Sequence, residues 1–137
     1  MKYFSRKLVA ILVLIIWLSS LGTNYAKADL SNAMTVSLGQ NGYAKFNNGL
    51  LIQWGYVDYS SYNNTTYFPT SFLNNQYSVQ ITSMVPSDAL VSIQVVEGSK
   101  TTTSFISRSR YIGTDLGDAG LQTGNDPYCW IAIGRWK

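Results

Sequence analysis

The chain has 137 residues, enough for one domain, with ten basic residues, seven acidic residues, one cysteine and no histidine. The lack of histidine excludes a Ser-His-Asp or Cys-His catalytic group and every histidine-containing zinc site. A single cysteine cannot form a metal site built from several thiolates.

The first 28 residues have the features of a secretory signal peptide. A basic start in residues 1–7 is followed by the apolar run Leu8–Leu18 and by the small-residue end Ala26-Lys27-Ala28. We expect cleavage between Ala28 and Asp29. An uncleaved anchor is the alternative, but the run is short for a membrane span, which needs about 20 apolar residues.

Removal of this segment changes the net charge. Four of the ten basic residues precede residue 29, so the mature part holds six basic and seven acidic residues, a net charge of −1. The basic surface of a nucleic-acid-binding protein is missing, and we expect no nucleic-acid partner. Contact with a membrane is expected only through the signal segment before cleavage.

Residues 29–39 are predicted to be a flexible segment before a domain at residues 40–137. Within it, Ser31-Asn32-Ala33 resembles the residues that remain when an expression tag is cut off. If so, the natural protein begins at Met34 and the signal peptide is foreign to it. The alternative is that three common residues occur together by chance.

From residue 35 onward, strand patterns recur without a helical period. Residues 43–46 and 50–56 flank Asn47-Asn48-Gly49, which predicts a hairpin with a primed turn. The second arm is apolar at nearly every position, so we expect it to be buried on both faces or nearly so. Further strands are predicted at residues 66–68, 76–82, 90–96, 101–107 and 128–136, with 108–112 as a continuation or a separate strand.

The last of these strands is the expected partner of the hairpin's second arm. Residues 128–136 place apolar groups on both faces, which predicts a subunit interface, with a central barrel strand as the alternative. Cys129 is interpreted as a small apolar residue of a buried strand rather than a reactive thiol. About seven short strands without helices predict a small antiparallel all-β sandwich.

Two inserts are long for hairpin loops, residues 57–65 and 113–127. The first gathers tyrosines and asparagines, side chains that bind uncharged ligands through rigid rings and adaptable hydrogen bonds. Its candidate ligand-binding residues are Tyr59, Tyr62, Asn63 and Asn64. The alternative is that the tyrosines pack at half-buried strand positions.

The second insert adds the candidates Asp115, Asp118 and Asn125. Paired carboxylates could hydrolyse a glycoside or bind Ca²⁺ through their oxygen atoms. The spacing of Asp115, Asp118 and Asp126 matches neither kind of site. We interpret them as solvated loop acids and expect no metal, no cofactor and no catalytic residue.

Four short motifs together resemble the C-terminal tip domain of phage tail-fibre proteins. They fall, in the family's order, on Gly42-Tyr43, Gly49-Leu50 with Gln53-Trp54-Gly55, Phe68-Pro69 with Phe72, and Trp130 with Ala132 and Gly134. The resemblance covers about residues 40–137. It implies a β-sandwich tip that assembles as a homotrimer and recognises host-surface glycans, with motifs in the core and no binding residue carried over.

Two departures from the family leave alternatives open. Tail fibres carry a shaft before the tip and have no signal peptide, and an exported prophage fragment would explain both differences. We expect a non-enzymatic domain that binds a bacterial cell-surface carbohydrate. The alternatives are an exported β-sandwich that binds an envelope component and a glycan-cleaving enzyme using the second insert. The protein is secreted or periplasmic if the signal peptide is native, and part of a virion tail fibre if it is not.

Overall fold

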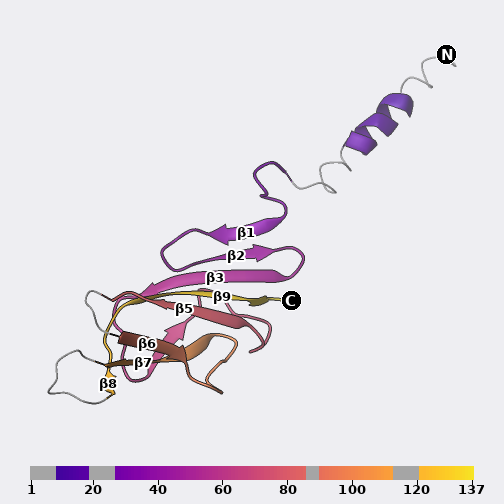
Figure 1. Ribbon diagram of the computed structural model, residues 1–137. Helices are drawn as coiled ribbons and strands as arrows, with labels where there is room; N and C mark the ends of the chain where they lie inside the picture. Colours follow the sequence, from indigo (N-terminus) through magenta and orange to yellow (C-terminus); the bar gives the residue numbers. More distant parts are fainter. Residues whose placement is uncertain (1–8, 19–26, 86–89, 113–120) are drawn as a thin grey trace, which may run out of the picture. The chain divides into compact units, whose positions relative to one another are not determined.

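The computed structural model describes residues 9–18, 27–85, 90–112 and 121–137 (Figure 1). The chain divides into two units, Met1–Thr35 and Val36–Lys137. In the first unit a helix covers residues 9–18, and none of the described helical segments is long and apolar enough to cross a membrane.

Asp29 Oδ1 accepts a hydrogen bond from the backbone N–H of Ser31 at 3.0 Å, and this bond lowers the pKa of Asp29.

The second unit is formed by β-strands arranged as two sheets (Figure 1). The strands of the described residues, including one that crosses the boundary between the units, are β1 (Met34–Ser37), β2 (Gly42–Phe46), β3 (Leu50–Val57), β4 (Asn64–Tyr67), β5 (Ser78–Ser83), β6 (Leu90–Val95), β7 (Ser104–Ile112), β8 (Gln122–Thr123) and β9 (Tyr128–Arg135). One sheet has the order β1-β2-β3-β9-β5. The other has the order β4-β7-β6, with β8 also paired to β7. The predicted all-β sandwich is confirmed.

The hairpin formed by β2 and β3 is confirmed, but its predicted turn type is wrong. Gly49 has a φ of 98°, and its N–H donates to the carbonyl of Phe46 at 2.9 Å. Neither Asn47 nor Asn48 has a positive φ, which a primed two-residue turn would require. The loop therefore has three residues, and only its last one adopts the left-handed conformation for which glycine is suited.

The predicted pairing of the hairpin with the last strand is also confirmed. β3 and β9 are antiparallel along their whole length, from Leu50 opposite Arg135 to Val57 opposite Tyr128. The prediction that β3 is buried, or nearly so, on both faces is met on one face only, because Leu51 and Gln53 are buried while Ile52 and Trp54 are half-buried on the other face. A sheet that packs on one neighbouring sheet buries only one of its faces.

β9 follows the same alternation. Tyr128, Trp130 and Ala132 are buried, whereas Cys129 and Ile131 are exposed. Cys129 is a free thiol on the outer face, so the interpretation of this residue as part of a buried strand is wrong. Its chain neighbours occupy the inner positions, and a period of two places Cys129 outside.

The core between the sheets is largely aromatic. Phe105 of β7 lies 6.0 Å from Trp130 of β9, measured between ring centroids, with the rings at 75°. Phe68, which follows β4, contacts four rings of this core with centroid separations between 5.0 and 5.6 Å, namely Phe72, Tyr77, Phe105 and Trp130. Most of these pairs are edge-to-face, the favoured geometry for aromatic rings, so the core joins both sheets.

Glycines make room for these rings. A Cβ at Gly55 would lie 2.6 Å from two ring atoms of Trp130, its partner across the strand pair. A Cβ at Gly42 would similarly lie 2.7 Å from the ring of Trp54. A Cβ at Gly134 would lie 2.6 Å from the Cβ of Tyr77. These positions therefore need glycine for space, although their backbone φ angles are ordinary.

Two buried polar side chains cross-link the core. Gln53 Oε1 accepts a hydrogen bond from the N–H of Thr70 at 3.0 Å, which ties β3 to the segment after β4. The hydroxyl of Tyr128 lies 2.6 Å from Thr66 Oγ1 and 2.9 Å from Ser107 Oγ. This second group connects β9 of one sheet to β4 and β7 of the other, and buried hydroxyls need such partners.

Candidate functional site

The first long insert is held to the four-stranded sheet by two small residues. Ser60 is fully buried, and the carbonyl of Ser61 accepts a hydrogen bond from the N–H of Ser109 in β7 at 3.2 Å. On either side of this anchor, Tyr59 is 64% exposed and Tyr62 is 45% exposed. The insert therefore presents both predicted tyrosines on the surface.

Tyr62 lies over two arginines of β7. The guanidinium carbon of Arg110 is 3.9 Å from the centroid of the Tyr62 ring, and that of Arg108 is 4.8 Å from it. Arg108 and Arg110 share the outer face of β7 because strand side chains alternate, and the intervening Ser109 is buried. The close approach of a cation to a ring face is attractive, by about 0.5–1 kcal/mol at exposed sites.

The two guanidinium groups also donate hydrogen bonds to side chains of flanking segments. Arg108 Nε donates to Asn63 Oδ1 at 3.1 Å, and Arg110 Nη1 donates to Thr123 Oγ1 of β8 at 3.1 Å. We call the set Tyr62, Asn63, Arg108, Arg110 and Thr123 the arginine cluster. Its aromatic and amide groups come from the first insert, and its cations come from the middle of the sheet.

The other predicted residues are placed differently. Asn64 points inward, and its Nδ2 donates to the hydroxyl of Tyr128 at 3.4 Å. Asn125 is exposed beyond β8, and within the described residues no hydrogen bond or ring contact joins it or Tyr59 to the cluster. Asp115 and Asp118 lie outside the described residues. The structure thus brings together Tyr62 and Asn63 of the predicted set.

Near the base of the same insert, Tyr56, the next-to-last residue of β3, lies beside Asp58. The Tyr56 hydroxyl donates to Asp58 Oδ1 at 3.0 Å. This hydrogen bond raises the pKa of Tyr56, because it is made by the protonated phenol to an acceptor that is an anion at neutral pH. Within the described part of the chain, no group of three or more potential metal ligands is found.

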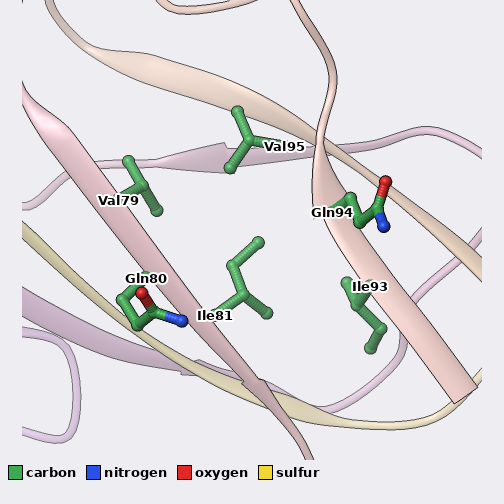
Figure 2. Close-up of a pocket in the computed structure, with 6 residues that line it drawn as sticks. All are labelled: Val79, Gln80, Ile81, Ile93, Gln94 and Val95. Atoms are coloured by element: carbon green, nitrogen blue, oxygen red, sulfur yellow. The ribbon is translucent and has the colours of Figure 1, made fainter.

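Apart from the arginine cluster, a hollow lies between the edge strands of the two sheets. It has a volume of about 250 Å³ and is lined by β5 and β6 (Figure 2). Its lining residues are Val79, Gln80, Ile81, Ile93, Gln94 and Val95. In Figure 2 the aliphatic side chains of both strands lie in the space between the two ribbons. Four of the lining side chains are aliphatic, and the side-chain amides of Gln80 and Gln94 are its polar groups.

The sequence profile of the tail fiber protein gp53-like, C-terminal family matches residues 45–135. The chain belongs to this family. The predicted resemblance to a phage tail-fibre C-terminal domain is therefore confirmed. No curated protein sequence matches the chain.

Solved structures of pyocin fibres share the fold of this tail-fibre domain. An R2 pyocin fibre of P. aeruginosa has 21% sequence identity and a TM-score of 0.55, over 82% of this chain and 30% of that one. An N-truncated R1-type pyocin tail fibre has 21% identity and a TM-score of 0.53, over 81% and 98% of the two chains. An N-truncated R2-type fibre has 23% identity and a TM-score of 0.54, over 86% and 47%.

In this tail-fibre domain most residues of the family motifs lie in the core, apart from the candidate site, whereas Trp54 lies on the outer face of the five-stranded sheet. Gln53 and Ala132 are fully buried, Phe72 and Trp130 are nearly so, and Gly55 accommodates the Trp130 ring. The arginine cluster occupies the outer face of the other sheet. The motifs therefore identify the tail-fibre core, while their separation from the ligand site stays a prediction.

Sequence reasoning missed the arginines of the site. Arg108 and Arg110 alternate within a strand, and this spacing places both on one face once the strand is known to continue through residue 112. The prediction left the continuation open, so the shared face was not recognised. The aromatic partner of the two arginines, Tyr62, is more than forty residues away from them in the sequence, and no local pattern links the three residues.

Proposed function

We propose that this tail-fibre domain is a non-enzymatic receptor-binding domain that recognises a carbohydrate on a bacterial cell surface. The observation that supports this proposal is the first insert, where Tyr59 and Tyr62 are both exposed and the amide of Asn63 follows Tyr62 in the chain. Aromatic faces stack on the apolar side of sugar rings, and amides bind their hydroxyls. Tyrosine and asparagine side chains supply such contacts at a low cost in conformational entropy.

Binding to a glycan array and to bacterial cells tests the proposal. Tyr59→Ala and Tyr62→Ala remove the two exposed rings, and we expect each to weaken binding by about tenfold, as for loss of one stacked ring. Tyr67→Ala is the matched control, because Tyr67 is an exposed tyrosine on β4, outside the insert. Unchanged binding in both insert variants would exclude the first insert as the receptor site.

We also propose that the domain acts as a homotrimer. The outer face of the five-stranded sheet carries a group of apolar residues that we call the isoleucine patch: Ile52, Trp54, Ile131 and Ile133. Ile52 is paired with Ile133, and Trp54 with Ile131, so the four side chains are neighbours on one face. Ile131 and Ile133 are 41% and 45% exposed, and contiguous apolar surface of this kind is typical of subunit contacts.

Light scattering at micromolar concentration measures the assembly directly. A mass three times that of the chain is expected, and a stable monomer would contradict the proposed trimer.

The proposed location of the protein depends on its signal peptide: the domain is secreted or periplasmic if the signal peptide is native, and part of a virion tail fibre if it is not.

The second candidate function is an exported β-sandwich protein that binds a component of the bacterial envelope. The N-terminal segment favours it, because a basic start, an apolar helix over residues 9–18 and a small-residue end precede the domain. Mass spectrometry of the native protein tests this candidate. A chain that begins at Asp29 is the expected result, whereas a chain that retains residues 1–28 would contradict export with cleavage.

A further inference from the structure

The outer face of the four-stranded sheet holds two cations side by side. Arg108 is paired with Gln94 of β6, and Arg110 with Ser92. Gln94 and Ser92 are exposed, and on the other flank of β7 Thr123 pairs with Arg110. The two guanidinium groups are therefore surrounded on this face by neutral polar side chains that can take part in hydrogen bonds.

Most hydrogen-bonding capacity of these guanidinium groups is unused within the described residues. Each guanidinium has five N–H donors. One donor of Arg108 is taken by Asn63, and one donor of Arg110 by Thr123. Both acceptors are uncharged, so these contacts hold the arginines in place without neutralising them.

Tyr62 fixes the arrangement further. Because both guanidinium carbons lie within 5 Å of one ring centroid, the ring limits the rotamers of both long side chains. Ordering an arginine side chain costs about 1.5–2 kcal/mol of rotamer entropy, and a ligand that meets a preordered fork avoids part of this cost. Two like charges held close together also repel, and an anion between them removes that repulsion.

We propose that the arginine cluster binds an oxyanion, the carboxylate or phosphate group of an acidic sugar in the surface glycan. This inference rests on the proposed function and adds that the receptor carbohydrate carries a negative charge. Arg108 and Arg110 donate to the oxygen atoms in the paired geometry that guanidinium groups favour. Asn63 and Tyr62 position the arginines, and Ser92 and Gln94 supply further polar contacts at the rim.

Titration with small probes, followed by NMR, tests the anion site. Glucuronate carries the carboxylate, glycerol 1-phosphate carries the phosphate, and glucose is the neutral probe. We expect the Nε–Hε signals of Arg108 and Arg110 to shift with either or both acidic probes and not with glucose. The affinity is expected to fall severalfold between about 50 and about 300 mM NaCl, because salt screens exposed charges. Equal shifts with glucose, or none with either acid, would overturn the proposal.

Variants that remove a positive charge test whether the acidic probes bind at the arginine cluster. Arg108→Gln and Arg110→Gln are each expected to weaken acidic-probe binding at least about tenfold, as for loss of one charge-assisted pair. Arg135→Gln is the matched control, because it removes one positive charge from an exposed position on the other sheet. Arg108→Lys keeps the charge but loses the planar fork, so it is expected to show an intermediate loss. Wild-type affinity in both glutamine variants would overturn the assignment.

The same experiments separate this proposal from the proposed function. If cells and neutral glycans are bound through Tyr59 and Tyr62 but acidic probes are not bound, the receptor-binding proposal stands and the anion site is wrong. If acidic probes bind the arginine cluster but no cell-surface carbohydrate is bound, the anion site stands and the glycan receptor is wrong.

Discussion

Two interior strands of the sandwich, β7 of one sheet and β9 of the other, contrast on both of their faces. β9 directs Tyr128, Trp130 and Ala132 into the core and leaves Ile131 and Ile133 on its outer face. β7 directs Phe105 inward together with the buried hydroxyls of Ser107 and Ser109, and its outer face carries Arg108 and Arg110. One strand is apolar on both sides, and the other is largely polar on both sides.

This contrast divides the surface by function. An outward apolar face in the middle of a sheet is best covered by another protein surface. An outward pair of arginines with neutral partners is best matched by an anionic ligand. The five-stranded sheet is thus suited to the proposed self-association and the four-stranded sheet to the proposed receptor contact, so the proposed assembly would leave the proposed ligand face accessible.

The largest expected effect is on assembly. Ile131→Asp places a charge at the centre of the isoleucine patch, and an unpaired charge buried in an interface costs about 3–5 kcal/mol. We expect the trimer to dissociate to monomers in sedimentation equilibrium. Thr65→Asp adds the same charge at an exposed position on β4 of the other sheet and should leave the assembly intact. If both variants remain trimeric, the isoleucine patch is not the subunit contact.

The next largest effect tests the inner face of β9. Gly55→Ala brings a methyl group to 2.6 Å from the Trp130 ring, and overpacking of this kind costs about 1–3 kcal/mol or more. We expect a loss of about 3 kcal/mol in the free energy of unfolding, measured with denaturant. Gly39→Ala is the control, since its nearest contact would be at 3.5 Å. Equal stability of the two variants would contradict the packing role of Gly55.

A smaller effect on stability tests the hydrogen-bonded link between β9 and β7. Tyr128→Phe removes the hydroxyl that lies between Thr66 and Ser107 in the core. Leaving buried hydroxyls with fewer partners costs about 1–3 kcal/mol, so we expect a loss of about 1.5 kcal/mol in chemical unfolding. Tyr67→Phe removes an exposed hydroxyl and should have no measurable effect. If Tyr128→Phe left the free energy of unfolding unchanged, the Thr66 and Ser107 hydroxyls would have to find other hydrogen-bond partners in the variant.

Much of the β9 side of the contrast was predictable from the sequence. A period of two along residues 128–136 separates Tyr128 and Trp130 from Ile131, and two apolar faces in a small domain indicate an interface. The pairing with β3 followed from two long apolar strands with no other equivalent partner. The pattern could not show which face of β3 is buried, because Ile52 and Trp54 are as apolar as Leu51, and the fully buried position is the polar Gln53.

The β7 side was much less predictable. The insert was identified from its tyrosines and asparagines, but the site depends on which strand lies beside it. The register of β4 with β7, in which Asn64 pairs with Ser107, is what brings Tyr62 next to Arg108. Such a register is set by the packing of the whole sandwich, and no local sequence feature encodes it. β8 was missed for a related reason, since two residues are too few for a strand pattern.

The smallest effect is a pH dependence at the junction of the two sheets. Tyr77, just before β5, stacks on Phe72 at 4.5 Å, and its hydroxyl donates to the carbonyl of Ser104 in β7 at 2.8 Å. Burial disfavours the phenolate and raises the pKa of Tyr77 from 10.0 to about 12.

Because the folded pKa lies above the unfolded value, the stabilisation from the neutral phenol is complete below pH 10 and is lost as the pH rises through 12. Tyr77→Phe removes this titration. We expect the variant's free energy of unfolding to fall less steeply than that of the wild type between pH 10 and 12. Below pH 10 the variant should be less stable, since it lacks the hydrogen bond to Ser104. Parallel pH profiles for the two proteins would show that the Tyr77 hydroxyl is solvated, and that β5 and β7 are joined at this point by ring packing alone.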